Sequence, residues 1–153
     1  MRALALGAVL AAAMAAPQAA DACGRTPEAA FSRFIAAFNA LDWPAFTDCL
    51  AANVSLFGPA NPGAVSLHRL DGRAEVERSF RAVFDAAATG PEPRGPDVHP
   101  EHVELQTFGA GALVTFEFKR AGDSFGRRSI LLVREGGDWR IGHIHASNVE
   151  EAR

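Results

Sequence analysis

The apolar residues of this chain change their spacing near its middle, and this change constrains the fold more than any other feature. Between residues 27 and 90 they recur every three or four positions, which is typical of amphipathic helices. Between residues 103 and 148 they recur at every second position, which is typical of strands that bury one face. Helices in one half and successive strands in the other predict an α+β fold, in which a curved antiparallel sheet packs against helices.

Two helices are expected at the start of this pattern. Thr26-Pro27 supplies a good cap and a good first helical residue for the first helix. Asp42 can cap a second, short helix that begins at Trp43-Pro44, because proline is tolerated in a first turn. We expect Asn53 to close that second helix.

A third helix and several strands complete the expected order. Residues 54–57 form a short strand and residues 66–70 allow another. Asp71 is expected to cap the third helix, which starts at Gly72. Four longer strands are expected at residues 103–107, 114–118, 129–133 and 139–148. No repeat or second domain is visible, so the chain is expected to fold around one core.

The first 22 residues have the pattern of an export signal. A positive residue is followed by an apolar stretch at residues 3–16 and by Ala20-Asp21-Ala22, which a signal peptidase accepts. A membrane anchor needs about 20 apolar residues, so cleavage is expected instead. Residues 23–153 then form one periplasmic or secreted domain that is not attached to a membrane. Lipid attachment to Cys23 is the alternative, but an alanine stands three positions before it, where a leucine-like residue is expected.

The sequence holds two cysteines, Cys23 and Cys49. In an oxidising compartment an isolated pair is most simply a disulfide, which would tie the start of the domain to the end of the second helix. Two separate buried thiols are the plain alternative. A catalytic cysteine is less favoured, because no base is evident beside either residue.

The last strand holds the strongest candidate site. Strict alternation places His143, His145 and Ser147 on one of its faces, beside two large apolar residues. Ile144 and Ala146 then lie on the other face. Two imidazoles and a hydroxyl next to apolar side chains are typical of a pocket wall. We therefore expect the imidazoles to face inward, and Ile144 and Ala146 to face outward.

A metal site is a competing interpretation of the same histidines. Gly137, His143, His145 and Glu150 have the spacing of the first metal motif of cupins. The second cupin motif should follow downstream and does not, so neither a metal nor a cofactor is expected. A further cluster at residues 99–102 contains two histidines and follows a Pro/Gly-rich linker, and it is interpreted as surface.

The charged residues exclude one class of partner. The net charge is −3 and no run of basic residues occurs, so nucleic-acid binding is not expected. Arg127-Arg128 puts one guanidinium on each face of its strand. One of them could reach the mouth of a pocket and hold an anion, although a surface salt bridge is the simpler interpretation. Glu117 should point outward.

Three stretches give the chain a resemblance to a known family. Residues 39–46 place a polar turn before the second helix, residues 71–76 form a glycine-led helix start, and residues 139–147 form a terminal strand. In this order they resemble the SnoaL-like and DUF4440 branch of the nuclear-transport-factor-2-like (NTF2-like) superfamily. The resemblance implies a cone-shaped α+β fold, with three N-terminal helices packed on a curved antiparallel sheet around one cavity. It also implies a homodimer.

The resemblance leaves the chemistry open, because relatives include isomerases, cyclases, dehydratases, epoxide hydrolases and pure binding domains. The chain has no tyrosine, so the oxyanion donor of the steroid-isomerase-like relatives cannot be carried over. It also lacks a match to the paired Asp/Arg/Asp arrangement of the epoxide-hydrolase branch.

Two functions therefore remain. In the first, the cavity binds a small, mostly apolar molecule without chemistry. In the second, the protein is a cofactor-free isomerase, cyclase or dehydratase in which His145 is the general base, His143 assists and Ser147 orients one of them. No inward acidic partner for the histidines is evident, which favours binding. The expected pocket residues are Phe38, Trp43, Phe57, Phe84, Phe116, Trp139 and Ser147.

Overall fold

The structure is a computed structural model that describes residues 23–58, 69–89, 94–120 and 124–150. The expected export signal, residues 1–22, and most of the expected strand at residues 66–70 lie outside these described residues. The described part contains the helices α1 (Pro27–Asn39), α2 (Trp43–Asp48) and α3 (Arg73–Thr89), and the strands β1 (Leu50–Phe57), β2 (Leu70–Asp71), β3 (Glu101–Phe108), β4 (Gly111–Lys119), β5 (Ser124–Glu135) and β6 (Asp138–Glu150).

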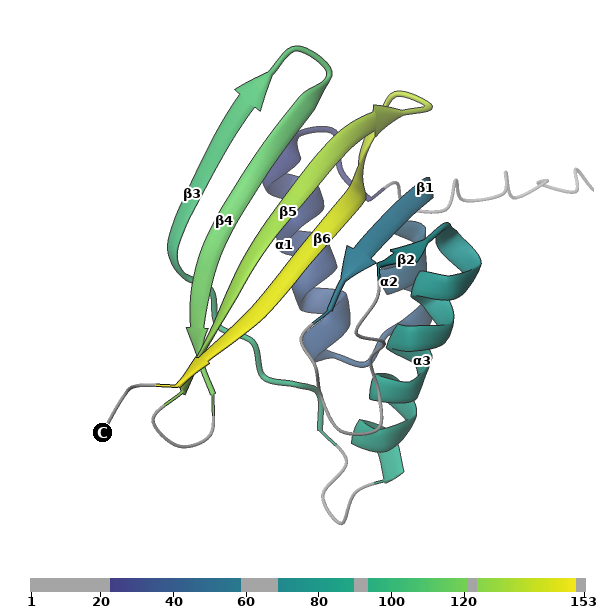
Figure 1. The fold of residues 1–153 in the computed structure, drawn as a ribbon. Helices are drawn as coiled ribbons and strands as arrows, with labels where there is room; N and C mark the ends of the chain where they lie inside the picture. The colour runs from purple at the N-terminus through teal and green to yellow at the C-terminus, as the bar shows by residue number, and fades with distance from the viewer. Residues whose placement is uncertain (1–22, 59–68, 90–93, 121–123, 151–153) are drawn as a thin grey trace, which may run out of the picture.

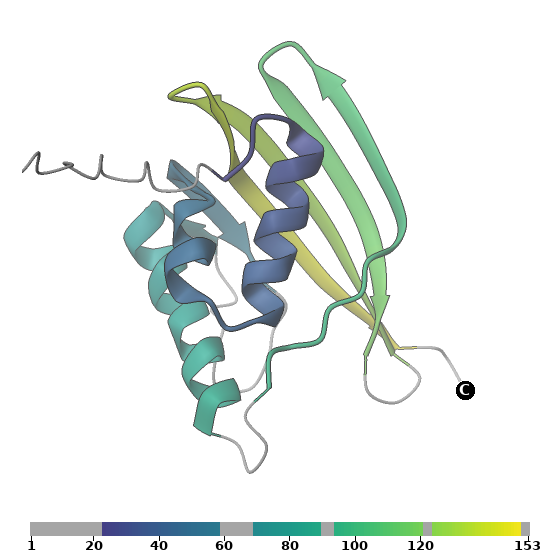
Figure 2. The same ribbon diagram turned by 180° about the vertical axis from the view of Figure 1, so that it is seen from behind.

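One curved sheet, in the order β2-β1-β6-β5-β4-β3, forms the first layer of the fold, and the helices form the second. Figure 2 shows α1 lying across one face of the sheet, with α2 and α3 on the same side. The predicted α+β class is confirmed. The expectation of a wholly antiparallel sheet is wrong, because β1 pairs with β6 in parallel.

The first two helices begin where their caps predict. The backbone N–H of Ala29 donates to Oγ1 of Thr26 over 3.2 Å, and that of Ala45 donates to Oδ1 of Asp42 over 3.1 Å. Each cap satisfies one of the N–H groups that the first turn of a helix leaves without a partner.

The predicted end of the second helix at Asn53 is wrong. Helix α2 ends at Asp48, and Leu50 already belongs to β1, where it pairs with Ile141 of β6. Pairing with a distant strand overrides the local preference of this alanine-rich stretch. The predicted cap at Asp71 is also wrong, because its Oδ1 accepts from Nε of Arg69 instead.

The core between the two layers is built around Phe46, whose side chain is 0% exposed. Five aromatic rings lie with their centroids 4.8–5.9 Å from its ring: Phe34, Phe38, Trp43, Phe80 and Phe84. They come from α1, α2 and α3, so this cluster fixes the three helices against one another.

The predicted disulfide between Cys23 and Cys49 is confirmed, with 4.8 Å between the two Cα atoms. Beside it, the N–H of Trp139 donates to the carbonyl of Gly24 over 2.8 Å. These links fix the start of the described domain to the end of α2 and to the start of β6. None of the described helices is long and apolar enough to cross a membrane.

Strand β6 contains a bulge that decides which of its side chains face the helices. Ile141 pairs with Leu132 of β5, but His143 pairs with the adjacent Leu131, so Gly142 is one extra residue. An extra residue reverses the alternation of every side chain that follows it.

Candidate functional site

A cavity of about 500 Å³ lies between the helices and the inner face of the sheet. Its walls come from α1, α3, the linker before β3, and the strands β1, β4, β5 and β6. The apolar part of the lining includes Phe34, Ile35, Phe38, Leu56, Phe80, Val83, Phe116, Phe118, Ile130, Ile144 and Ala146. A largely apolar cavity of this size is typical of a small-molecule site.

The linker before β3 forms one wall of the cavity and is held by Asn39. The side-chain amide of Asn39 donates to the carbonyl of Val98, and its oxygen accepts from the N–H of Val98, both over 2.8 Å. At Gly95 a Cβ atom would lie 1.8 Å from the carbonyl oxygen of Asn39. The linker can therefore follow the end of α1 this closely only with glycine at that position.

Asp97 is the acidic residue among the described residues of the lining. Its carboxylate is already engaged, because Oδ2 lies 3.1 Å from Nη2 of Arg94 and Oδ1 lies 3.0 Å from Nε2 of His99. Its backbone has a φ of 57°, in the left-handed region, which aspartate adopts more often than most other non-glycine residues.

Arg128 is the most enclosed charged group of the lining. Its Nη1 donates to the carbonyls of Arg127 and Ser147, both over 2.8 Å. Its guanidinium lies over the ring of Phe118, with Cζ 4.8 Å from the ring centroid. Burial, with a smaller effect of the nearby Arg120, lowers the pKa of Arg128 to about 10. The group therefore keeps its positive charge at neutral pH in a poorly solvated place.

The expectation that His143 and His145 face the cavity is wrong. After the bulge at Gly142, the side chains of Ile144 and Ala146 face the helices and line the cavity. The two histidines lie on the outer face of the sheet, so the outward position expected for Ile144 and Ala146 is wrong as well. The prediction that the histidines act in catalysis stays a prediction.

On the outer face, the side chain of His143 contacts residues of β1. Oγ of Ser55 lies 2.8 Å from its Nδ1, and the ring of Phe57 lies with its centroid 6.1 Å from the rings of both His143 and His145. Burial lowers the pKa of His143, the nearby Arg69 and His145 lower it further, and Asp71 opposes them with a smaller effect. The ring is consequently neutral at pH 7.

The expected pocket residues are divided between three places. Phe38 and Phe116 line the cavity. Trp43 and Phe84 belong to the cluster around Phe46 instead, because helix packing turns their rings toward it.

The remaining expected pocket residues lie away from the cavity. Trp139 is buried beside Gly24, before the bulge. Phe57 is 43% exposed on the outer face. Ser147 pairs with Arg127, whose side chain points outward, and only its carbonyl reaches Arg128.

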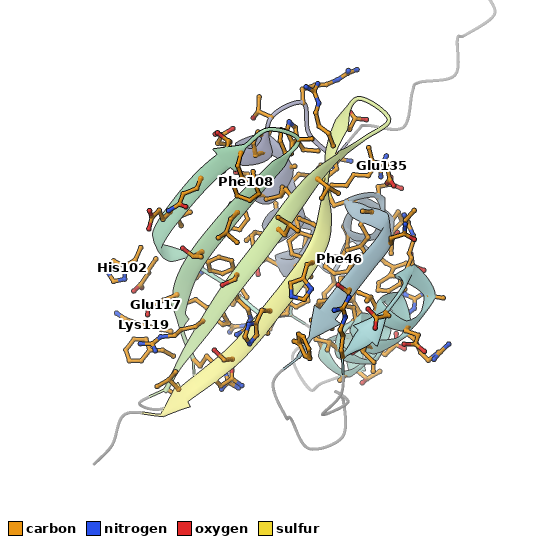
Figure 3. All side chains as sticks on the ribbon, turned by 45° about the horizontal axis from the view of Figure 1, so that its top comes forward. Phe46, His102, Phe108, Glu117, Lys119 and Glu135 are labelled. Atoms are coloured by element: carbon orange, nitrogen blue, oxygen red, sulfur yellow. A yellow bond between two sulfur atoms is a disulfide. The ribbon has the colours of Figure 1, made fainter. Side chains whose placement is uncertain are left out.

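The outer face also carries a small ionic network, and Glu117 points into it as predicted. Its Oε1 lies 2.9 Å from Nε of Arg127, and its Oε2 lies 3.4 Å from Nδ1 of His102. Arg127 therefore forms the expected surface salt bridge while Arg128 enters the cavity. Figure 3 shows His102, Glu117 and Lys119 grouped at one end of β3 and β4, with Phe108 at the other end.

Among the described residues, no group of three or more His, Cys, Asp or Glu side chains could hold a metal ion. His99 and His102, which were interpreted as surface residues, are 79% and 80% exposed at their side chains.

Sequence reasoning missed the linker residues Arg94 and Asp97, and it gave Ile144 and Ala146 the wrong face. The one local signal was Gly142, because a glycine inside a strand often marks a bulge. The pattern alone gives no reason to place a bulge at this glycine rather than continue the alternation.

A family model described as a SnoaL-like domain matches residues 28–150. The match confirms the SnoaL-like resemblance, while the DUF4440 branch stays a prediction. Among the curated proteins, none matches this chain.

Solved structures of other proteins have a similar fold. An NTF2-like protein of unknown function from Pseudomonas putida has a TM-score of 0.62 at 18% identity, over 76% of this chain and 80% of that one. A proposed ketosteroid isomerase from Parabacteroides distasonis has a TM-score of 0.61 at 17% identity, over 82% and 89%. A proposed NTF2-like dehydratase from Streptomyces avermitilis has a TM-score of 0.60 at 20% identity, over 78% and 90%. At these identities the similarity shows the fold alone.

Proposed function

The chain belongs to the SnoaL-like domain family, and from that premise we propose that it binds a small, mostly apolar molecule in the cavity between its helices and its sheet. The observation that carries this proposal is the cavity of about 500 Å³, whose wall is formed by aromatic and aliphatic side chains from six elements. Ligand sites are commonly cavities of about 300–1,000 Å³ with few polar groups.

The cavity is a feature of the folded chain and not a gap left by loose packing. Phe46, Val54, Val114 and Leu132, which belong to the core and not to the cavity lining, are all 0% exposed. Since protein interiors are normally packed without large voids, an open space of this size beside such a core supports a binding role.

A cofactor-free isomerase, cyclase or dehydratase is the second candidate, because two proteins of similar fold are described as a proposed isomerase and a proposed dehydratase. With His145 on the outer face, the base in such a reaction would be Asp97, the described carboxylate of the lining. Its engagement with Arg94 and His99 argues against this role. Binding therefore remains the first candidate.

We also propose that the protein is exported and works outside the cytoplasm. A disulfide between Cys23 and Cys49 is stable in an oxidising compartment, and the first 22 residues have the pattern of a signal. The mass of the protein recovered from the periplasm or medium tests this, because a cleaved chain should begin near Cys23.

A homodimer through the outer face of the sheet is a further part of the proposal. Three apolar side chains, Leu113, Leu131 and Val133, lie next to one another on that face, and Phe108 beside them is 53% exposed. Apolar side chains that are gathered on one face of a sheet favour a partner surface.

Mass spectrometry of small molecules released from the purified, folded protein tests the binding function directly. A bound apolar molecule should appear with wild type and should be lost in Ala146→Phe and Val83→Trp, which fill the cavity from β6 and from α3. The control is Ala86→Phe, which adds the same ring at an exposed position of α3. Equal recovery from all four proteins would place the molecule outside the cavity.

A deuterium-exchange experiment separates binding from catalysis. The released molecule is incubated with the protein in D₂O and its mass is measured. Incorporation of deuterium with wild type, and its loss in Asp97→Asn, would favour the isomerase or dehydratase. An unchanged mass supports binding alone.

A further inference from the structure

The charged side chains of the cavity lining are mostly positive. We propose that the molecule bound in this cavity carries a carboxylate, and that Arg128 binds it. This inference rests on the proposed function, since it names the chemical class of the ligand for the same cavity.

Cations outnumber anions in the described lining. It contains Arg94, Lys119, Arg120 and Arg128, against Asp97. Arg94 is neutralised by Asp97 at 3.1 Å, and Lys119 lies 3.9 Å from Glu101. Two guanidinium groups, those of Arg120 and Arg128, therefore remain without a carboxylate among the described residues.

Arg120 is fixed by a neutral group. With the Asn148 amide turned so that its nitrogen donates to the carbonyl of Ser147, its oxygen accepts from Nη1 of Arg120 over 3.1 Å. This contact orients the Arg120 side chain without pairing its charge with a carboxylate.

Arg128 is fixed in the same way and at more points. The carbonyls of Arg127 and Ser147 both accept from its Nη1, and the Phe118 ring lies under the guanidinium at 4.8 Å. These contacts use one of its three nitrogens. Nε and Nη2 have no acceptor among the described residues, and these two neighbouring nitrogens match the two oxygens of one carboxylate.

Arg128 is poorly solvated and has no counter-ion among the described residues. Burial and the neighbouring Arg120 both act against the charge of Arg128, and a buried charge is costly unless it is paired. A bound carboxylate would offset both effects by pairing with the guanidinium, whereas a neutral ligand would offset neither. The aromatic and aliphatic wall next to Arg128 then accommodates the apolar body of the same molecule.

The neighbouring Arg127 is a control for the proposed role of Arg128. Arg127 and Arg128 are adjacent in β5, but Arg127 points to the outer face and lies 2.9 Å from Glu117. A carboxylate held in the cavity should depend on Arg128 and be insensitive to Arg127.

The experiment compares three probes that share one apolar ring system and differ in charge: 2-naphthoate, 2-naphthamide and 2-naphthylmethylamine. Their dissociation constants are measured by calorimetry with the folded wild-type protein and with Arg128→Gln, Arg128→Lys and Arg127→Gln. Ala146→Phe shows whether the probes occupy the cavity.

We expect wild type to bind naphthoate at least tenfold more tightly than naphthamide, and the amine least tightly. Arg128→Gln should remove this preference while leaving the affinity for naphthamide within about twofold, since a charged partner strengthens a hydrogen bond. Arg128→Lys should keep part of the preference, Arg127→Gln should keep all of it, and Ala146→Phe should weaken every probe.

Other results separate the two proposals. If naphthoate and naphthamide bind equally well to wild type, the carboxylate inference fails and the apolar cavity function stands. The same conclusion follows if Arg127→Gln weakens naphthoate as much as Arg128→Gln does. If no probe binds up to its solubility limit, both proposals fail. The ratio in wild type decides the matter even if Arg128→Gln does not fold.

Discussion

Oγ of Ser55 lies 2.8 Å from Nδ1 of His143, across the parallel pairing of β1 and β6. Ser55 is 7% exposed, and His143 lies next to Phe57 on the outer face. In the tautomer that carries its proton on Nε2, the imidazole accepts from the hydroxyl at Nδ1. The contact joins the only parallel pair of strands in the described sheet.

The first prediction concerns the titration of His143. Burial lowers its pKa below 6.5 in the folded protein, whereas the unfolded chain titrates near 6.5, so the folded state binds fewer protons between these two values. The free energy of unfolding should therefore increase as the pH rises through this window, and the contribution of His143 should stop changing above it. NMR titration of the ring and urea unfolding at several pH values measure both effects.

The matched variant is His143→Gln, which should remove this part of the pH dependence while leaving the rest. A ring that titrates above 6.5, or an identical pH dependence in the variant, would contradict the lowered pKa.

The second prediction concerns the disulfide. The two cysteines are 26 positions apart in the sequence, and the chain-entropy model gives a loss of about 3.5 kcal/mol when a link of this length is removed. Urea unfolding of the Cys23→Ser/Cys49→Ser double variant should show this decrease. A thiol count should give no reactive thiol in the unfolded, unreduced protein and two after reduction, and two thiols before reduction would refute the link.

The third prediction compares two phenylalanines with opposite exposure. Phe46→Ala should lower the free energy of unfolding by about 3–5 kcal/mol, because a fully buried ring leaves a cavity among five others. Phe57→Ala, which truncates a ring that is 43% exposed, should cost about 1 kcal/mol or less. Urea unfolding measures both, and equal costs would contradict the position of Phe46 at the centre of the core.

The fourth prediction concerns the outer face of the sheet. If two copies pair there, Leu131→Glu should convert a dimer into a monomer, because it places a charge at the centre of the apolar group. Ala86→Glu adds the same charge at an exposed position of α3 and should leave the dimer intact. Analytical ultracentrifugation measures the mass, with circular dichroism as the check that each variant is folded. A monomeric wild type would refute the dimer.

Local rules predicted much of the fold from the sequence. The caps at Thr26 and Asp42 each act on N–H groups three residues away, so a short stretch of sequence contains all that is needed. The outward position of Glu117 also follows from simple alternation, because β4 has no bulge in its pairing with β5.

The candidate site was predicted less well, because the bulge at Gly142 changes the faces of the residues that follow it in β6. Of the expected pocket residues, Phe38 and Phe116 line the cavity; both lie in regular elements whose period is unbroken. The histidines, Ser147 and the two residues expected outside all follow Gly142 and are therefore reversed. Arg128 was one of two adjacent arginines that the sequence could not tell apart.

The sequence by itself determined the α+β class, the starts of the first two helices and the cysteine pair, because periodicity, caps and composition act over a few residues. Only the tertiary structure decided the direction of β1 and the faces of β6. The direction of β1 depends on its pairing with β6, a strand far away in the chain. In the pairing of β6 with β5, one extra residue turned Ile144 and Ala146 into the cavity and the imidazoles of His143 and His145 away from it.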